Sequence, residues 1–389
     1  MTQAALAGQY RAFAVAVGRD GTAVYQRICD GIAGDADLLA LSAEAPAAQR
    51  RPNLLLAAVH YLLLSGADDR LADHYPTVAE WRGAQSPGAQ SPGAGWRATA
   101  WPTAATPTEP VPDGRDPFAE FAEFCRRHRE EVAGLLAVRA TQTNEVGRCA
   151  VLLPAFTTVA AEAGQPLALV DLGASAGLNL LFDRYGYDYG DRGTAGVAGS
   201  PVVLACEVRS GVLPDLSVPA VAYRAGLDQR PVDVDDDDAV RWLLACQWPQ
   251  QLARFRRLRA AVQIARATPD RGRVAVGDVV GDLVETVRQV PETAHLCLYH
   301  SWVAAYLDED RQRALAQVVA GIAGDRPLSW VYAEQPYEVP GLPMPAPPEG
   351  QKVKGATAVV LVRFDGDRPV ARRLADVHPH GRWLHWWGA

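Results

Sequence analysis

The stretch Leu167-Ala-Leu-Val-Asp-Leu-Gly-Ala-Ser-Ala-Gly-Leu-Asn179 decides the fold class of this chain. It begins with a short, almost wholly apolar run, which is typical of a strand buried on both faces. Gly173 and Gly177 then predict a tight turn, and the apolar residues that follow predict the start of a helix. A buried strand, a glycine-rich turn and a helix indicate the first unit of a parallel α/β sheet.

The same turn fits two different chemistries. As Asp171-x-Gly173-x-Ser175-x-Gly177, it resembles the cofactor loop of S-adenosylmethionine (SAM) methyltransferases, with Ser175 at the usual middle glycine. As Gly173-x-Ser175-x-Gly177, it also fits the nucleophile elbow of α/β-hydrolases. The dinucleotide-binding pattern G-x-G-x-x-G fits poorly, because three residues separate the two glycines here.

Composition excludes several classes of protein. The chain has 389 residues, enough for one large core or two ordinary ones, and a net charge of -7, which argues against a large nucleic-acid interface. The N-terminus does not resemble a signal peptide, and no apolar run reaches the roughly 18 residues of a membrane span. Six scattered cysteines without C-x-x-C spacing indicate buried thiols in a reducing compartment. We therefore expect a cytoplasmic protein with no membrane partner.

The sequence predicts two domains. Residues 1–150 show apolar residues at helical spacing and are expected to form a helical cap domain. Within it, residues 83–117 are predicted to be a flexible Pro/Gly/Ser-rich loop that contains the repeated pentapeptide Ala-Gln-Ser-Pro-Gly at 84–88 and 89–93. From residue 151 to 389 we expect an α/β domain of the SAM-methyltransferase type.

Alternating strand-like and helical runs define the expected sheet. Helices are predicted to follow the first five strands, the longest of them near 237–267, after the acidic run 235–238 that suits a helix N-terminus. Asp-Gly at 365–366 predicts a final hairpin, and residues 186–216 are interpreted as an inserted hairpin. The expected fold is thus a seven-stranded Rossmann-like sheet with strands at 167–171, 220–227, 273–277, 295–300, 328–333, 357–364 and 368–374.

Polar residues end the first five strands, namely Asp171, Asp228, Asp278, His300 and Glu334. Ligands of open parallel sheets bind beyond the carboxyl ends of the strands, where the strand order reverses. A nucleoside needs groups of this kind: small residues for close approach of the backbone, helix N–H groups for a carboxylate, and acids for sugar hydroxyls and an amine. Asp228 suits the sugar and Asp278 the adenine amine, with Asp188 and Glu207 as rivals for the sugar.

The order of these residues resembles motifs I, II and III of SAM methyltransferases. Longer phrases are similar to the family catalogued as domain of unknown function 2332: Asp171-Leu-Gly-Ala-Ser-Ala-Gly-Leu-Asn-Leu180, Arg224-Ala-Gly-Leu-Asp-Gln-Arg-Pro-Val-Asp233, Arg241-Trp-Leu-Leu-Ala-Cys-Gln-Trp-Pro249, Tyr299-His-Ser-Trp302 and His378-Pro-His-Gly-Arg-Trp-Leu384. The resemblance implies a methyltransferase-like fold and SAM as cofactor, but little about the substrate. The cofactor residues it implies are Asp171, Gly173, Ala174, Ser175, Gly177, Asn179, Asp228, Asp278, Val279 and His300.

The substrate side is less specific. His300 is a candidate general base, with packing beside the adenine as its alternative role. Glu334 and Tyr337 follow the fifth strand, where a substrate would meet the sulfonium, and are the other candidate catalytic residues. The tail around Trp383, Trp386 and Trp387 suits either a lid or core packing.

These observations favour a SAM-binding, methyltransferase-like enzyme that acts on a small molecule or peptide. A SAM-binding protein that does not methylate is one alternative, because Ser175 replaces a glycine and no base is certain. A Ser hydrolase with Ser175 and His378 or His380 is another, although the expected strands before its elbow are missing. No metal site and no nucleic-acid partner are predicted, and a homodimer or a partner protein is compatible with the sequence.

Overall fold

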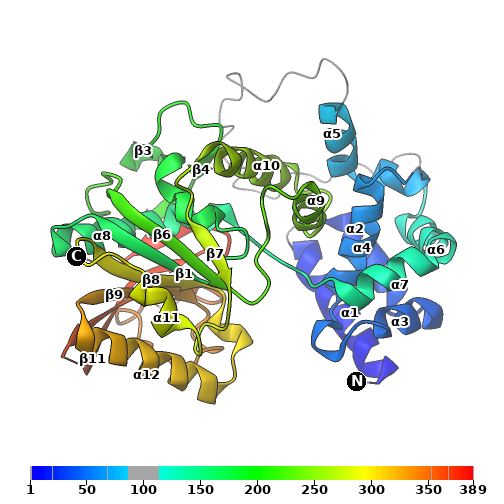
Figure 1. The fold of residues 1–389 in the computed structure, drawn as a ribbon. Coiled ribbons are helices and arrows are strands. Elements are labelled where there is room, and N and C mark those ends of the chain that lie inside the picture. The colour runs from blue at the N-terminus through cyan, green and yellow to red at the C-terminus, as the bar shows by residue number, and fades with distance from the viewer. Residues whose placement is uncertain are drawn as a thin grey trace. The chain divides into compact units, whose positions relative to one another are not determined.

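A computed structural model describes residues 2–19, 21–67, 69–85, 114–351, 353–366 and 368–388. These residues form two compact units (Figure 1). The first contains the described residues up to 143 together with Asp235–Arg259, and the second contains Asn144–Val234 and the described residues from Ala260 on. The segment Asp235–Arg259 thus groups with the helical part, whereas our division placed it in the α/β domain. The repeated pentapeptide and most of the predicted loop 83–117 lie outside the described residues.

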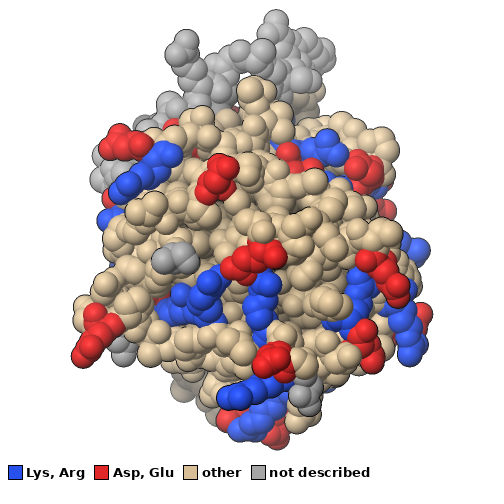
Figure 2. Space-filling view, turned by 90° about the vertical axis from the view of Figure 1, so that its left-hand side faces the viewer, with Lys and Arg blue, Asp and Glu red and all other residues tan. Residues whose placement is uncertain are grey.

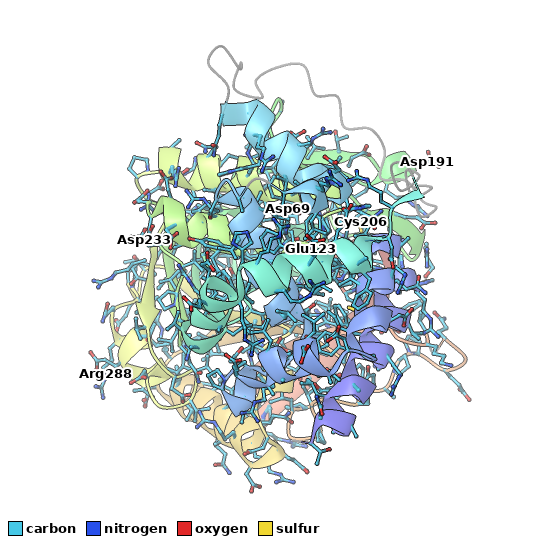
Figure 3. All side chains as sticks on the ribbon, turned by 90° about the vertical axis from the view of Figure 1, so that its right-hand side faces the viewer. Asp69, Glu123, Asp191, Cys206, Asp233 and Arg288 are labelled. Carbon is cyan, nitrogen blue, oxygen red and sulfur yellow. The ribbon has the colours of Figure 1, made fainter. Side chains whose placement is uncertain are left out.

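The first unit is built from helices with polar caps. Asp35 accepts from the backbone N–H groups of Asp37 and Leu38, and Asp236 accepts from those of Asp238 and Ala239, so the acidic run does begin a helix as expected. Asp69 and Glu123, labelled in Figure 3, both pair with Arg127. The helices are α1 (Gln3–Arg19), α2 (Ala23–Ile32), α3 (Ala36–Ala43), α4 (Pro52–Leu64), α5 (Pro76–Gln85), α6 (Pro117–Arg127), α7 (Arg129–Val138), α9 (Asp237–Ala245) and the first part of α10 (Leu252–Ala267).

The apolar helix α4 forms the centre of this unit, and His60 lies within it fully buried. Its Nδ1 lies 3.0 Å from the carbonyl oxygen of Ala245, and its Nε2 lies 2.8 Å from the Thr77 hydroxyl. Burial lowers the pKa of His60 to about 4, because the charged imidazolium loses its hydration. The residue is therefore a hydrogen-bonded core histidine.

The second unit contains a large, mostly parallel sheet of nine strands. Its order is β5-β12-β11-β10-β9-β8-β1-β6-β7, and β7, β6, β1, β8 and β9 run parallel to one another. All seven predicted strands are present: β1 (Leu167–Leu172), β6 (Val221–Asp228), β7 (Arg273–Val276), β8 (His295–Ser301), β9 (Leu328–Glu334), β10 (Thr357–Asp365) and β11 (Arg368–Val377). The α/β class is thereby confirmed.

The predicted count of seven strands was wrong, because two further strands extend the sheet. β12 (Trp383–Trp386) pairs with β11, and β5 (Glu207–Ser210) pairs with β12. The predicted insertion supplies β5 and a small separate sheet. In that sheet β2 (Gly186–Asp188) pairs antiparallel with β3 (Thr194–Gly196), as a hairpin requires, and parallel with β4 (Val203–Ala205).

The helices also differ from expectation. The residues after β1 form a short 3₁₀ segment, η5 (Leu178–Arg184), instead of an α-helix, and the described residues between β9 and β10 contain no helix. Proline explains the second difference, because Pro336, Pro340, Pro343 and Pro345 lie in that connection. The long helix expected near 237–267 is interrupted between α9 and α10, just where Pro249 lies.

Helices cover both faces of the sheet, and the strand alternation sorts residues between them. The face with Val170, Leu298 and Trp330 packs in one core with residues of α11 (Leu283–Arg288) and α12 (Glu309–Asp325). On the opposite face, Phe156 of α8 (Cys149–Ala163) packs edge-on against Tyr299, with ring centroids 5.1 Å apart. Two neighbouring strand ends can therefore carry side chains to opposite sides of the sheet.

One described segment, Val146–Ala163, is long and apolar enough to cross a membrane by length and composition alone, contrary to our expectation that no such run exists. Within the protein, 72% of it is buried, which is typical of a core helix.

On the surface, charges of both signs are mixed: Figure 2 shows a face on which basic and acidic side chains lie close together in small groups. Among the ion pairs of the described residues, Glu162 pairs with Arg372 at 2.8 Å and with Arg363.

Candidate functional site

The carboxyl ends of β6, β1 and β8 form the candidate site. Among the five parallel strands, β6 is the next after β1 in the chain and lies on one side of β1, whereas the later strand β8 lies on the other, so the strand order reverses at β1. A crevice at such a reversal is the usual ligand site of open α/β sheets. The predicted glycine-rich turn follows β1 and therefore lies at this point.

The turn after β1 is a series of left-handed backbone conformations. The φ angles are 75° at Gly173, 53° at Ser175 and 70° at Gly177. Packing also demands glycine at the two ends, because a Cβ at Gly173 would lie 2.4 Å from the Val303 side chain and one at Gly177 would lie 2.9 Å from Val274. Ser175, by contrast, is strained, because a left-handed backbone costs a serine energy that it does not cost a glycine.

Asp228, at the end of β6, holds this turn. Its Oδ2 accepts from the Ser175 N–H at 2.8 Å, and its Oδ1 accepts from the Arg230 N–H at 2.8 Å. The Ala174 N–H donates to the β6 carbonyl of Leu227 at 3.3 Å, which brings the turn and the strand end together. A carboxylate offers about four acceptor sites, so these two bonds leave capacity for a ligand.

The two rivals for the sugar-binding role lie elsewhere. Asp188 ends β2 of the small sheet, where its Oδ1 accepts from the Gly190 N–H at 2.9 Å. Glu207 lies on β5, at the opposite end of the large sheet from β6, and pairs with Arg209 at 2.9 Å. Of the three acids, the structure brings Asp228 to the glycine-rich turn.

Asp171 lies on β1 beside Tyr299 of β8 and is 4% exposed. Burial raises the pKa of its carboxyl to about 8, and the nearby Asp228 charge adds to this effect. The Tyr299 hydroxyl and the Arg148 guanidinium act in the opposite direction. Asp171 therefore holds its proton far more tightly than an exposed carboxyl does.

The predicted adenine residues Asp278 and Val279 have structural partners. Arg311 binds Asp278 at 2.6 Å, and Asp278 Oδ1 also accepts from the N–H groups of Val280 and Gly281. Although desolvation raises the pKa of Asp278, the hydrogen bonds from Gly281 and Arg311 outweigh it and lower that pKa. Val279 is buried in the core. Asp278 does adjoin the site, since Gln229, next to Asp228, donates to it at 3.4 Å.

Asn179 is buried beneath the turn. Its Oδ1 accepts from the Cys149 thiol at 3.4 Å, so its side chain serves α8 packing in this structure. Ala174 is also buried, and its Cβ occupies the space that a side chain at Gly226 would need, 2.6 Å from such a Cβ. These two predicted cofactor residues therefore fix the shape of the turn from below.

His300 and Glu334 form a fully buried pair on the α12 side of the sheet. Nδ1 of His300 lies 2.8 Å from Glu334 Oε1, which also accepts from the N–H groups of Val303 and Ala304. Among the described residues, His300 Nε2 and Glu334 Oε2 have no hydrogen-bond partner. The imidazole stacks on Tyr332, with centroids 5.3 Å apart. The third predicted catalytic residue, Tyr337, is 73% exposed and is not enclosed with this pair.

Sequence reasoning missed Arg148 and underrated Trp302. Arg148 donates to the Ser301 carbonyl oxygen at 2.9 Å and, through Nε, to the Pro379 carbonyl oxygen at 3.1 Å. Its guanidinium also lies 5.8 Å from the centre of the Trp302 ring. Trp302 has a φ of 59°, and with Ser175 it is one of two non-glycine residues with positive φ in the described part of the chain. Strained residues at the ends of neighbouring strands are typical of functional sites.

Asn144 is another residue that sequence reasoning missed. Its Oδ1 accepts from the Leu178 N–H at 3.1 Å, just beyond the glycine-rich turn. The available signal for both residues was the polar phrase Asn144-Glu-Val-Gly-Arg148, which immediately precedes the long apolar helix α8.

The geometry disfavours a Ser hydrolase. The Ser175 Oγ is buried and has no hydrogen-bond partner among the residues that the structure describes. A nucleophilic serine needs a base within hydrogen-bond reach. The two candidate bases lie by other groups: His380 Nδ1 is 3.6 Å from Glu145, and His378 Nδ1 accepts from the His380 N–H at 3.0 Å.

Comparison with known proteins adds a family but no activity. No curated protein matches the chain. One family model, described as "Uncharacterized protein conserved in bacteria (DUF2332)", matches residues 7–91 and 98–386, which is most of the chain. The glycine-rich turn, the strand ends described above and nearly all of the helical residues fall within this match, and the chain therefore belongs to the DUF2332 family.

Proposed function

We propose that this protein binds SAM across the carboxyl ends of β6, β1 and β8 and is a methyltransferase-like enzyme acting on a small molecule or peptide. One observation carries the proposal. The left-handed turn Gly173–Gly177 lies where the strand order reverses, and an acid at the end of the neighbouring strand, Asp228, is bonded to that turn. This combination suits a nucleoside that lies close to the backbone of the glycine-rich turn.

The residues present fit such a cofactor. Asp228 has acceptor capacity for sugar hydroxyls, and the orphaned, buried hydroxyl of Ser175 offers a further polar contact in the turn. The Trp302 indole N–H, also buried and without a hydrogen-bond partner among the described residues, lies at the end of β8. When bound, the sulfonium would supply an electrophilic methyl group. The engaged carboxylate of Asp278 makes it a weaker candidate for the purine than the sequence predicts.

The proposed proton acceptor is His300. Glu334 Oε1 accepts from the backbone N–H groups of Val303 and Ala304 and lies 2.8 Å from His300 Nδ1, so it would orient the ring by accepting from Nδ1. Nε2 then carries the lone pair that takes a proton from the methyl acceptor. In-line positioning supplies most of the rate enhancement in such a transfer, so one base suffices. Tyr337 is exposed on the connection after β9, so it would contact only a part of the substrate that stays at the protein surface.

Isothermal titration calorimetry with SAM and with its demethylated product tests the proposal. We expect Asp228→Asn to weaken binding at least about tenfold, which equals about 1.4 kcal/mol. The amide loses one acceptor oxygen and directs N–H groups at the backbone donors of Ser175 and Arg230. Asp191→Asn, at an exposed position of the insertion, is the matched control. Absence of binding of both compounds to the unmodified protein would refute the proposal.

A second measurement separates methyl transfer from its main alternative. The protein is incubated with a metabolite extract and SAM that carries a deuterated methyl group, and the products are analysed by mass spectrometry. A deuterium-labelled product that His300→Asn abolishes supports methylation. Consumption of SAM without any labelled product would select the non-methylating alternative.

A further inference from the structure

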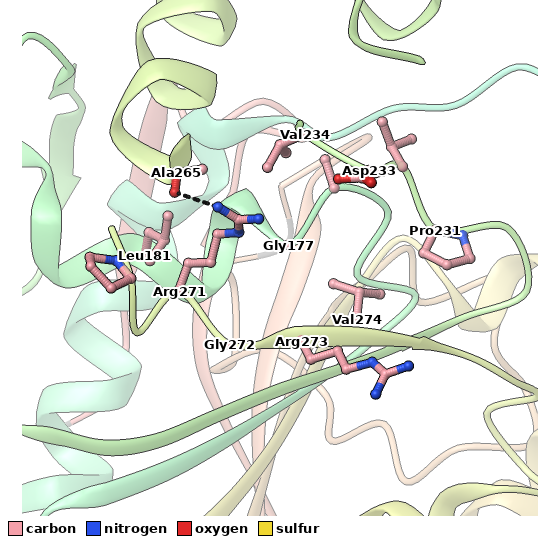
Figure 4. Close-up of a pocket in the computed structure, with 13 residues that line it drawn as sticks. Gly177, Leu181, Pro231, Asp233, Val234, Ala265, Arg271, Gly272, Arg273 and Val274 are labelled. Carbon is pink, nitrogen blue, oxygen red and sulfur yellow. Dashed lines mark hydrogen bonds between the residues drawn. The ribbon is translucent and has the colours of Figure 1, made fainter. Parts of the chain in front are cut away.

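A second feature of the α/β unit is a cavity of about 520 Å³, part of whose lining is formed by Ala176 and Gly177 of the glycine-rich turn (Figure 4). Its size falls within the range of pockets that enclose small organic ligands. The short segment η5, which follows the turn, contributes Leu181 to the lining of the cavity. All the residues that line it belong to the second unit.

The floor of the cavity is apolar and buried. It includes Leu181 of η5, Val232 and Val234 of the connection after β6, and Ala265 of α10, each less than 9% exposed. This apolar floor favours a ligand with an apolar part, because the two apolar surfaces are removed from water together when the ligand binds.

The rim of the cavity is charged, with both signs present. Arg271 reaches over the cavity and donates through Nη1 to the Ala265 carbonyl oxygen at 3.4 Å, as the dashed line in Figure 4 shows. Asp233 carries its carboxylate on another part of the rim, and Arg273 extends away from both. Arg271 and Asp233 both make further interactions within the protein, and a guanidinium has five N–H donors, which allows it to serve protein acceptors and a ligand carboxylate together.

We propose that this cavity binds a small zwitterion with an apolar body, the chemical class of an apolar amino acid. The Arg271 guanidinium receives the carboxylate of the ligand, Asp233 receives its ammonium, and Leu181, Val232 and Val234 contact its side chain. The site is distinct from the one proposed for SAM, with which it shares only the wall formed by Ala176 and Gly177. The inference does not depend on SAM binding.

The test is calorimetry with L-phenylalanine on the full chain, in the absence of SAM. Two analogues each remove one charge: phenylalaninamide lacks the carboxylate and 3-phenylpropanoate lacks the ammonium. We expect each analogue to bind about twofold to fivefold more weakly than L-phenylalanine, because each loses one ion pair, and pairs with the exposed Asp233 or the partly exposed Arg271 are screened by solvent. Running the titration without SAM keeps its outcome separate from that of the proposed function.

Two variants assign the charges, and a third tests the place. Arg271→Gln should abolish the preference for L-phenylalanine over its amide, and Asp233→Asn should abolish the preference over 3-phenylpropanoate. Ala265→Phe fills the cavity and should abolish binding, with circular dichroism and the melting temperature checking that it folds. Asp191→Asn serves as the control that leaves binding unchanged.

Each other outcome overturns the inference. No saturable heat with L-phenylalanine refutes the ligand class. Equal affinity for all three compounds refutes the role of the charged rim. Binding that survives in a folded Ala265→Phe variant refutes this cavity as the site; if that variant does not fold, unchanged affinity in both Arg271→Gln and Asp233→Asn refutes it instead.

Discussion

Replacement of Ser175 by glycine should stabilise the protein, although it removes a buried side chain from the centre of the candidate site. The left-handed backbone, φ 53°, costs a non-glycine residue about 1–2 kcal/mol that glycine does not incur. The buried Oγ lacks a hydrogen-bond partner among the described residues, and loss of an unsatisfied hydroxyl gains about 1 kcal/mol. Glycine gives back about 0.5–1 kcal/mol through the greater entropy of its unfolded chain. The sum favours Ser175→Gly by about 1–2 kcal/mol.

Ser175→Ala separates the two contributions, because alanine removes the hydroxyl but retains the strained backbone. We expect alanine to gain about 1 kcal/mol or less and glycine to exceed it by about 0.5–1 kcal/mol. Urea denaturation followed by circular dichroism gives the free energies, provided that the slope of the transition is unchanged between variants.

The result bears on function as well as stability. Strain and an unsatisfied hydroxyl persist at a position only where something compensates, and ligand binding is the usual compensation. Ser175→Gly should therefore be more stable but bind SAM more weakly. A glycine variant less stable than the unmodified protein would refute the reasoning, because it would show that Ser175 makes a stabilising interaction that the structure does not contain.

Three further predictions concern the same strand ends. The pKa of Asp171 is about 8 in the folded protein and about 4 in the unfolded chain, so its contribution to the free energy of unfolding falls as the pH rises from about 4 to about 8. Asp171→Asn should flatten this dependence and be more stable than the unmodified protein at pH 8. Urea denaturation at pH 5 and pH 8 measures both effects. Gly173→Ala should lower the free energy of unfolding by about 3 kcal/mol or more, through backbone strain and a clash with Val303. The control Gly190→Ala, at φ 60° with open space around its Cβ, should lower it by only about 1 kcal/mol. Equal losses of stability in the two variants, measured by thermal melting, would contradict the packing argument. Arg148→Met should lower the free energy of unfolding by about 2 kcal/mol, because three hydrogen bonds to Pro379 and Ser301 are lost. Arg148→Lys should not restore them, because a compact ammonium lacks the guanidinium fork. Full rescue by lysine in the same assay would show that the guanidinium is not needed to join these segments.

Local signals predicted the strands and their polar ends well. Each core strand is a short apolar run with a polar residue at its end, and the hydrogen-bonded register then carries Asp171, Asp228, His300 and Glu334 to one edge of the sheet. The glycines of the turn were also predictable, because both φ and packing exclude other residues there.

The signals that failed were either non-local or overridden. β5 and β12 are short strands whose pairing joins residues near 207 to residues near 384, and no local pattern reveals such a partner. Arg148 is similar, since its bonds to Ser301 and Pro379 cross most of the α/β unit in sequence. The missing helix after β9 was predictable: the prolines of that connection carried the information, and the expectation of regular alternation overrode them.

The two halves of the candidate site lie on opposite faces of the sheet, and Val303 joins them. Strand alternation directs Asp171 to the face covered by α8, and it directs His300 and Glu334 to the face covered by α12. The backbone N–H of Val303 donates to Glu334 Oε1 at 2.8 Å, while its side chain fills the space in front of Gly173. A shift of the buried Glu334 carboxylate must therefore move a residue that packs directly on the glycine-rich turn. Because packed interiors transmit small displacements instead of absorbing them, the pair His300–Glu334 and the turn Gly173–Gly177 are coupled through Val303.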